Sequence, residues 1–243
     1  MWQPRGVRTI AGVDGRRGGW ALAIATVDDD LLVAVDWHIV PGQDALGVAE
    51  VFRRARQAGA AAVGVDAPLG LPATHWRPCD LLAKRRLGRA SARVFLAPPR
   101  AVLAAGSYGE ARVVARAMLA GRGVSAQAYG LRGIVLSLDD VLRTDPLARG
   151  LAVEVHPELS FMAMAGRAPG DPLPSKRTAA GRAAREAALA RWAVPGLGLL
   201  APAGDDHLDA LAAAWSAVRF IARHAEVLGG EPDEVGLPMR IAV

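Results

Sequence analysis

The sequence is almost without cysteine. A single cysteine, Cys79, excludes an internal disulfide and excludes a zinc site built from cysteines alone. Any bound metal must therefore be held by oxygen or imidazole ligands. No activating base is evident near Cys79 in the sequence, so we expect this residue to be a small member of the core.

Long hydrophobic runs are also missing. No apolar stretch approaches the roughly 20 residues that a helix needs to cross a bilayer. The first residues of the chain lack the apolar core of a secretion signal. The sequence therefore predicts a cytoplasmic protein with no membrane partner.

Aromatic residues are scarce, at 5% of the chain, so stacking platforms for single-stranded nucleic acid are few. This favours recognition of a backbone or of a structure over readout of bases. The glycines of residues 15–19 lack the spacing of a phosphate-binding or dinucleotide-binding loop and predict a hairpin turn. No internal repeat is found, which disfavours folds made of duplicated domains.

What the sequence does contain is typical of a globular domain. Its 243 residues are 52% hydrophobic and 22% charged. That length can bury a substantial core without requiring a second domain. We expect one domain spanning residues 1–243.

Positive charge is concentrated in one window of the chain. The net charge of the whole chain is +5, whereas residues 77–100 contain seven basic side chains against one acid, Asp80. A patch of this density suits an anionic partner such as a phosphate backbone, and it equally suits a solvated helix face. Both interpretations stay open. The basic residues are Arg77, Lys84, Arg85, Arg86, Arg89, Arg93 and Arg100.

Short apolar runs alternate with turn signals at the start of the chain. Residues 9–14, 20–26 and 31–40 predict a three-stranded antiparallel meander. An amphipathic helix over residues 44–58 leads to a buried strand at residues 61–66. By the crossover rule, this fourth strand should lie parallel to the first.

A long interruption then separates two strand patterns. Residues 68–150 contain helical patterns and predict a lid-like insertion, because structureless loops of that length are rare. A fifth strand follows at residues 151–155. The fold class is therefore α/β, with a mixed five-stranded sheet flanked by helices. Helices are expected at about 80–89, 108–119, 125–142, 178–192 and 204–225, whereas residues 231–243 contain too many breakers to assign.

Acidic residues fall where this fold would bring them together. Asp14 and Asp66 each end a buried strand, and parallel neighbours bring their carboxyl ends to one edge of a sheet. Glu154 lies near the end of the fifth strand, and Asp206 and Asp209 share one face of the last helix. We predict Asp14, Asp66, Glu154 and Asp209 as catalytic residues, and Asp14, Asp66, Asp206 and Asp209 as metal ligands.

Such a cluster predicts metal chemistry. Several carboxylates at one point repel one another and take up protons unless a cation neutralises them. Hard oxygen ligands select Mg²⁺ or Mn²⁺. Two such ions about 4 Å apart can activate a water and stabilise the leaving oxygen of a displacement at phosphorus. We therefore expect a two-metal hydrolysis of phosphodiester bonds.

Each acid also has a structural explanation. Asp14 precedes Gly15 and suits a turn, Asp205 suits a helix N-cap, and Asp206 suits a first helical turn. Asp209 lies on an Ala/Leu face, where an unpaired charge is costly. It therefore needs a partner, and a metal would serve.

Basic side chains and one histidine are candidates for substrate binding. Guanidinium groups contact phosphate oxygens in pairs, and Lys176 follows a Gly/Pro loop where a helix begins. Taken singly, each of the basic residues is expected to face solvent. His156 could position a water or a phosphate, or it could be a structural histidine. The substrate-binding candidates are Arg77, Arg85, His156, Lys176 and Arg185.

Several short motifs occur in order over nearly the whole chain. They are Gly12-Val-Asp14 with Gly18-Gly-Trp20, Val65-Asp-Ala-Pro-Leu-Gly-Leu-Pro72, Arg77-Pro-Cys-Asp80, Val94-Phe95 with Ala97-Pro98, Glu154-Val-His-Pro-Glu158 with Phe161, Ser175-Lys176, Gly181 with Arg185, and Asp205-Asp206-His-Leu-Asp-Ala210. In these motifs the chain resembles the domain of unknown function 429 family, whose members are described as predicted RNase H-like nucleases.

The resemblance implies an RNase H-like sheet, with Asp14, Asp66 and an acid of the last helix as metal ligands. The spacing of Asp206 and Asp209 is similar to the final-helix acid pair of Holliday-junction resolvases. Ordinary RNase H proteins lack the large insertion after Asp66, so the resemblance does not predict an RNA–DNA hybrid as substrate.

The sequence leaves three functions open. The first is a divalent-metal-dependent nuclease or phosphodiesterase acting on nucleic acid or another phosphorylated anion. The second is a phosphotransferase of the actin and sugar-kinase type, because Asp-Gly after a first strand also opens phosphate loops there. The missing duplication disfavours that function. The third is a catalytically idle nucleic-acid-binding module.

Overall fold

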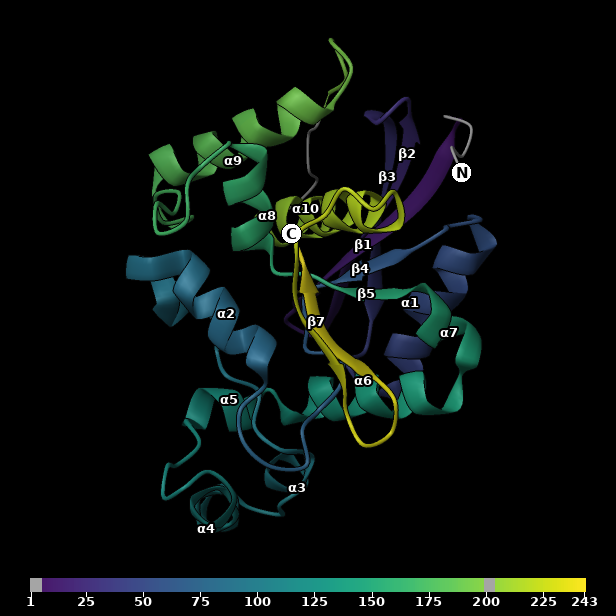
Figure 1. Cartoon of the computed structure of the whole chain (residues 1–243). Helices are drawn as coiled ribbons and strands as arrows, with labels where there is room; N and C mark the ends of the chain where they lie inside the picture. Colours follow the sequence, from purple (N-terminus) through teal and green to yellow (C-terminus); the bar gives the residue numbers. More distant parts are fainter. Residues whose placement is uncertain (1–5, 199–203) are drawn as a thin grey trace.

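A mixed five-stranded sheet forms the centre of the computed structural model, which describes residues 6–198 and 204–243 (Figure 1). The strand order is β3-β2-β1-β4-β5, in which the neighbours β3–β2 and β2–β1 are antiparallel and the neighbours β1–β4 and β4–β5 are parallel. The predicted meander, parallel crossover and α/β class are confirmed. The first five residues, where the sequence shows no secretion signal, lie outside the described residues. The strands are β1 (Arg8–Arg16), β2 (Gly19–Asp28), β3 (Leu31–Pro41), β4 (Val63–Val65) and β5 (Ala152–Glu154).

Helices cover both faces of the sheet because the central strands carry apolar side chains on both faces. On one face, α10 (Gly204–Ile221) packs against β1, β2 and β4. On the other face, α1 (Ala45–Gln57) and α6 (Arg132–Thr144) enclose a second core around Val13 and Val65. The Asp44 side chain caps α1 by accepting a hydrogen bond from the Gly47 backbone N–H at 2.9 Å.

Two glycines allow α10 to approach the sheet very closely. A Cβ atom at Gly12 would lie 1.9 Å from the Ala210 carbonyl oxygen, and one at Gly64 would lie 2.2 Å from that of Ala213. Any side chain at either position would push the helix outward. This close contact fixes the height of Asp209 above the ends of β1 and β4.

The insertion of residues 68–150 is helical, as predicted, but it is not wholly a lid. Its α6 packs against α1, and Leu138, Val141 and Leu142 join the sheet core. Only the earlier helices lie beyond the sheet edge in Figure 1. A break at Leu131 divides the helix expected at 125–142. The other helices of this stretch are α2 (Pro78–Leu87), η1 (Gly88–Arg93), α3 (Arg100–Leu103), α4 (Tyr108–Met118), α5 (Ala126–Gly130) and α7 (Pro146–Leu151).

The last third of the chain contains elements that the sequence did not reveal. α9 (Ala179–Trp192) was expected, whereas α8 (Pro157–Met164) begins at once after the fifth strand. The unassigned tail forms a hairpin of β6 (Val227–Pro232) and β7 (Pro238–Ala242). Its apolar residues pack against α2 and β5, so tertiary contacts outweigh the local glycines and prolines.

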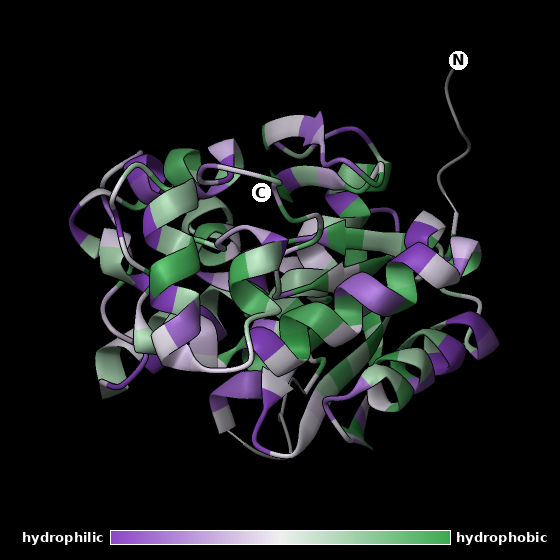
Figure 2. Ribbon diagram, turned by 90° about the horizontal axis from the view of Figure 1, so that it is seen from below, coloured by the Kyte–Doolittle hydropathy of each residue, from purple (hydrophilic) through white to green (hydrophobic). Residues whose placement is uncertain are grey.

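Hydrophobic residues gather on the central sheet and on the helix faces turned towards it, as Figure 2 shows. Within residues 6–198 and 204–243, none of the helices combines the length and the apolar character needed to span a membrane. The expectation of a single domain stays a prediction.

Candidate active site

Asp14 and Asp66 lie side by side: Asp14 is two residues before the end of β1, which runs beyond its predicted end, and Asp66 directly follows the parallel strand β4. Val13 is paired with Val65, and the Asp66 backbone N–H donates to the Val13 carbonyl oxygen at 3.0 Å. The next residue on each strand is therefore an aspartate at the carboxyl edge of the sheet. The two carboxyl groups interact electrostatically. The predicted convergence of these two acids is thus present.

Asp209 completes this group from the first turns of α10. It is 5% exposed, and its carboxylate accepts a hydrogen bond from the Lys176 ammonium. Lys176 lies in the loop before α9 and also interacts electrostatically with Asp14 and Asp66. We call Asp14, Asp66 and Asp209 the acid cluster.

The acid cluster is short of positive charge. Burial, followed by repulsion from Asp66 and Asp209, raises the pKa of Asp14 well above its ordinary value. Burial and repulsion from Asp209 raise the pKa of Asp66 to about 7, although Lys176 opposes this. Burial also raises the pKa of Asp209. Lys176 lowers the pKa of all three carboxyl groups and Arg185 lowers that of Asp209, but neither outweighs burial, so a further cation would favour ionising all three together.

Asp206 lies at the rim of this group. Its carboxylate is 3.9 Å from Arg16 Nε, its side chain is 40% exposed, and its effect on the pKa of Asp14 is the smallest of those that raise it. Asp205 lies in the first turn of α10, 3.9 Å from Arg182.

Glu154 is not part of the acid cluster. It is level with Val65 rather than with Asp66, and successive side chains of a strand point to opposite faces. Its carboxylate instead accepts hydrogen bonds from the Arg77 guanidinium at 2.5 Å and from the Leu69 backbone N–H at 2.7 Å. Burial raises the pKa of Glu154 to about 8, and Arg77 opposes that rise.

A second buried group surrounds Glu154. Cys79, Asp80 and Glu154 bring ligand atoms within 4.8 Å of one another and could hold a metal ion. Arg77 already lies among them, 2.9 Å from the Cys79 sulfur and 3.6 Å from Asp80. Burial raises the pKa of the Cys79 thiol to about 12, which disfavours the thiolate that a metal would bind. We call these four residues the Arg77 cluster. Cys79 is fully buried in the core, as expected.

The predicted phosphate-binding arginines are placed differently from one another. The expectation that each faces solvent is wrong for Arg77 and Arg185, which are 0% and 1% exposed because acids hold them inside the fold. Arg85 is exposed on α2 and does not border the acids. Lys176 is the one basic candidate that lies against the acid cluster.

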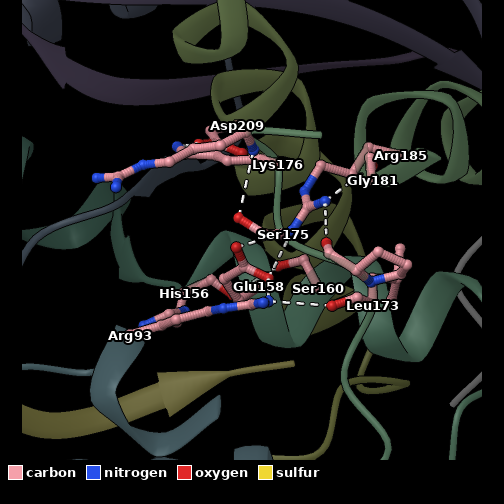
Figure 3. Close-up of polar contacts among 12 residues, drawn as sticks. Arg93, His156, Glu158, Ser160, Leu173, Ser175, Lys176, Gly181, Arg185 and Asp209 are labelled. Atoms are coloured by element: carbon pink, nitrogen blue, oxygen red, sulfur yellow. Dashed lines mark hydrogen bonds and ion pairs between the residues drawn. The ribbon is translucent and has the colours of Figure 1, made fainter. Parts of the chain in front are cut away.

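Glu158 is a charged residue of the site that sequence reasoning did not single out. Figure 3 shows its carboxylate between Arg93 and Arg185, which donate to it at 2.9 and 2.7 Å. It also raises the pKa of Asp66 and of Asp209. The signal was present, since Glu158 opens α8 directly after the fifth strand, but that helix was not predicted.

His156 lies beside Glu158 on the wall of the same cleft. Its Nδ1 atom is buried with no hydrogen-bond partner within the described part of the chain. Burial lowers the pKa of His156, which favours the neutral imidazole.

The acid cluster forms the floor of a cleft of about 630 Å³. Strand ends and the loop of Lys176 border one side, and the insertion borders the other with Phe95, Leu131 and Ile134. Pockets of this size commonly bind small molecules.

The chain was also compared with known proteins. A family model described as "Protein of unknown function (DUF429)" matches residues 12–234. The chain belongs to this family. The family named from the short motifs is therefore confirmed. No curated protein and no solved structure gives a significant match to this DUF429 chain.

Proposed function

We propose that this DUF429 chain is a divalent-metal-dependent nuclease or phosphodiesterase whose site is the acid cluster. The observation that carries the proposal is the meeting of Asp14, Asp66 and Asp209 from three separate elements on the floor of one cleft. Burial raises the pKa of all three carboxyl groups, so a bound cation would favour their ionised forms.

The donor set suits a hard divalent cation. Carboxylate oxygens are the ligands that Mg²⁺ and Mn²⁺ prefer, and the excess of negative charge favours binding. Asp14, Asp66 and Asp209 would hold the ion, with Asp206 at the rim. Such an ion supplies a Lewis acid for phosphoryl oxygens and lowers the pKa of water.

The side chains around the acids have their own tasks. Lys176 orients Asp209 through their hydrogen bond, and its 39% exposed side chain can contact an entering phosphate. Arg93 and Arg185 hold Glu158 in place. The neutral His156 can accept or pass on a proton at the cleft wall.

The test is cleavage of single-stranded, duplex, hybrid and junction nucleic acids with Mn²⁺, together with bis(p-nitrophenyl) phosphate as a general diester. Asp66→Asn should lower the rate by about 100-fold or more and abolish tight Mn²⁺ binding, because losing a ligand costs more than losing its supporting partners. Asp171→Asn, an aspartate paired with Arg89 and Arg167 outside the cleft, is the matched control. Wild-type protein that neither binds Mn²⁺ nor cleaves any substrate would refute the proposal.

The Arg77 cluster is the rival metal site and needs its own variant. Cys79→Ala removes one of its three ligands and leaves the acid cluster intact. Mn²⁺ affinity should be unchanged in this variant, as measured by calorimetry. A loss of affinity would move the metal site to the Arg77 cluster.

A further inference from the structure

The shape of the cleft bears on which phosphoester the acid cluster would process. Asp14 is 8% exposed and Asp209 5%, so both lie deep in the floor rather than on an open surface. The insertion borders the cleft opposite them, with Phe95, Leu131 and Ile134. A reacting phosphate must therefore enter the cleft, which a phosphate in the middle of a rigid duplex does poorly.

The basic window offers little to a long phosphate backbone. Five of its seven basic side chains are ion-paired to acids of this chain. Arg77, for instance, is paired with Glu154, and Arg100 with Asp139 and Asp233. Affinity for a duplex backbone rests on many unpaired cations that replace counterions. The other three paired residues are Arg86, Arg89 and Arg93.

The lining of the cleft is instead divided between charge and apolar surface. Lys176 and Arg177 stand beside the acids and can contact phosphate oxygens. Phe95 and Ile134, both half-buried, offer an apolar wall against which a planar ring can stack. Gln127, exposed on α5 at the same wall, can donate and accept hydrogen bonds. Trp20 also borders the cleft, and its buried indole nitrogen has no hydrogen-bond partner among the described residues.

We infer that the cleft takes a nucleotide-sized phosphoester, either a free nucleotide or the unpaired end of a strand, with phosphate at the acids and base against Phe95. The volume of about 630 Å³ lies within the range of sites for such molecules. The inference rests on the proposed function for its chemistry, but binding of a nucleotide can be measured without turnover.

The test combines binding with hydrolysis, both with Mn²⁺. Calorimetry with thymidine 5′-monophosphate measures occupation of the cleft. Hydrolysis is compared for thymidine 5′-(p-nitrophenyl phosphate), a linear single-stranded oligonucleotide and a covalently closed duplex circle. We expect the nucleotide to bind, and the first two substrates to be hydrolysed at least 10-fold faster than the circle. The ratio of the first two rates distinguishes a free nucleotide from a strand end.

Two variants obstruct the cleft without touching the acids. Ile134→Trp narrows the cleft. Gln127→Trp also narrows it, and because Gln127 is exposed, this substitution should disturb folding less. Each should weaken nucleotide binding by about 10-fold and leave Mn²⁺ binding unchanged. Leu147→Trp, at a 69% exposed position on α7 outside the cleft, is the matched control.

The outcomes separate this inference from the proposed function. Internal nicking of the circle as fast as the single strand would overturn the inference and leave the phosphodiesterase proposal intact. Nucleotide binding that Gln127→Trp weakens, without hydrolysis of any substrate, would overturn the phosphodiesterase and leave the nucleotide site. Absence of nucleotide binding by a protein that still cleaves bis(p-nitrophenyl) phosphate would also overturn the inference.

Discussion

The acid cluster and the Arg77 cluster lie at the same end of one sheet, but their buried carboxylates differ in the cations with which they are paired. In the Arg77 cluster, one fully buried guanidinium meets Glu154 and Asp80. Backbone N–H groups of Leu69 and Ala97 donate to those carboxylates at 2.7 and 2.8 Å. In the acid cluster, three carboxylates share one lysine that is 39% exposed.

This difference separates a structural role from a chemical one. In the Arg77 cluster both carboxylates are hydrogen-bonded to the guanidinium or to backbone N–H groups of two loops of the insertion, so the cluster fixes that segment to the fifth strand, although Asp80 and Glu154 also border the cleft. The acid cluster opens on a cleft and keeps excess negative charge, so it has capacity for a further cation. The ligand atoms of Cys79, Asp80 and Glu154 lie within 4.8 Å of one another, closer together than those of the acid cluster, so proximity alone would favour the Arg77 cluster as the metal site. However, the Arg77 guanidinium already supplies a cation among those ligand atoms, so the acid cluster is the better candidate for a metal ion.

Removing the cation of the Arg77 cluster should have the largest effect on stability. Arg77→Met leaves the carboxylates of Glu154 and Asp80 buried without their partner. Breaking a buried ion pair from one side costs about 3–5 kcal/mol. Urea unfolding should show this loss in the free energy of unfolding.

Two controls sharpen that prediction. Arg85→Met removes an exposed arginine from the same region and should change the free energy of unfolding by less than about 0.5 kcal/mol. Arg77→Met combined with Glu154→Gln should recover part of the loss, because one uncompensated charge is gone. If Arg77→Met alone is as stable as the wild type, the Arg77 cluster does not have the structural role assigned to it.

In the acid cluster, by contrast, removing a negatively charged side chain should stabilise the metal-free protein. The pKa of Asp66, raised to about 7 by burial and by Asp209, lies above its value in the unfolded chain. The protonated form is therefore the stabilising one, and its contribution is lost as the pH rises through about 7. Metal-free protein should melt at a higher temperature at pH 5.5 than at pH 8.

Asp66→Asn cannot ionise and should show a shallower pH dependence of the melting temperature. At pH 8 in a chelator we expect this variant to melt about 3 °C or more above the wild type, since 1 kcal/mol shifts a domain of this size by about 2–4 °C. Asp171→Asn should keep the wild-type slope. If the melting temperatures of the wild type and both variants depend equally on pH, ionisation of Asp66 does not destabilise the folded protein.

The sequence predicted the sheet well, because its signals are local. The strands around Asp14 and Asp66 are apolar runs with clear stops, and chain chirality then brings their ends together. The periodicity also predicted the longer insertion helices α2, α4 and α6, but not the short helices α3 and α7. The β6–β7 hairpin was not, because its glycines and prolines are breakers that only packing against α2 and β5 overcomes.

The site was only partly predictable for a related reason. Asp209 and Lys176 were identified singly, but their contact depends on how closely α10 rests on Gly12 and Gly64. Because α8 was not predicted, Glu158 was not recognised as a residue of the site. The sequence also gives no sign that Arg77 is buried, since a window rich in arginine looks the same whether its partners are solvent or distant acids. Charge pairing across 77 residues, as between Arg77 and Glu154, is a property of the folded chain.

Removing the cation of the acid cluster should have the smallest effect on stability and completes the comparison. Lys176→Met costs about 1 kcal/mol or less, because the Lys176 side chain is 39% exposed, whereas that of Arg77 is fully buried. The same variant should bind Mn²⁺ more tightly by up to about 5-fold, since a competing positive charge is gone. Lys84→Met, which replaces the only other lysine, is the matched control. The Lys84 Nζ atom donates to the Ser91 carbonyl oxygen at 2.8 Å, and Lys84 does not line the cleft, so the Mn²⁺ affinity of the Lys84→Met variant should equal that of the wild type. If Lys176→Met destabilises the protein as strongly as Arg77→Met, the acid cluster is a closed ion-pair network rather than an open cation site.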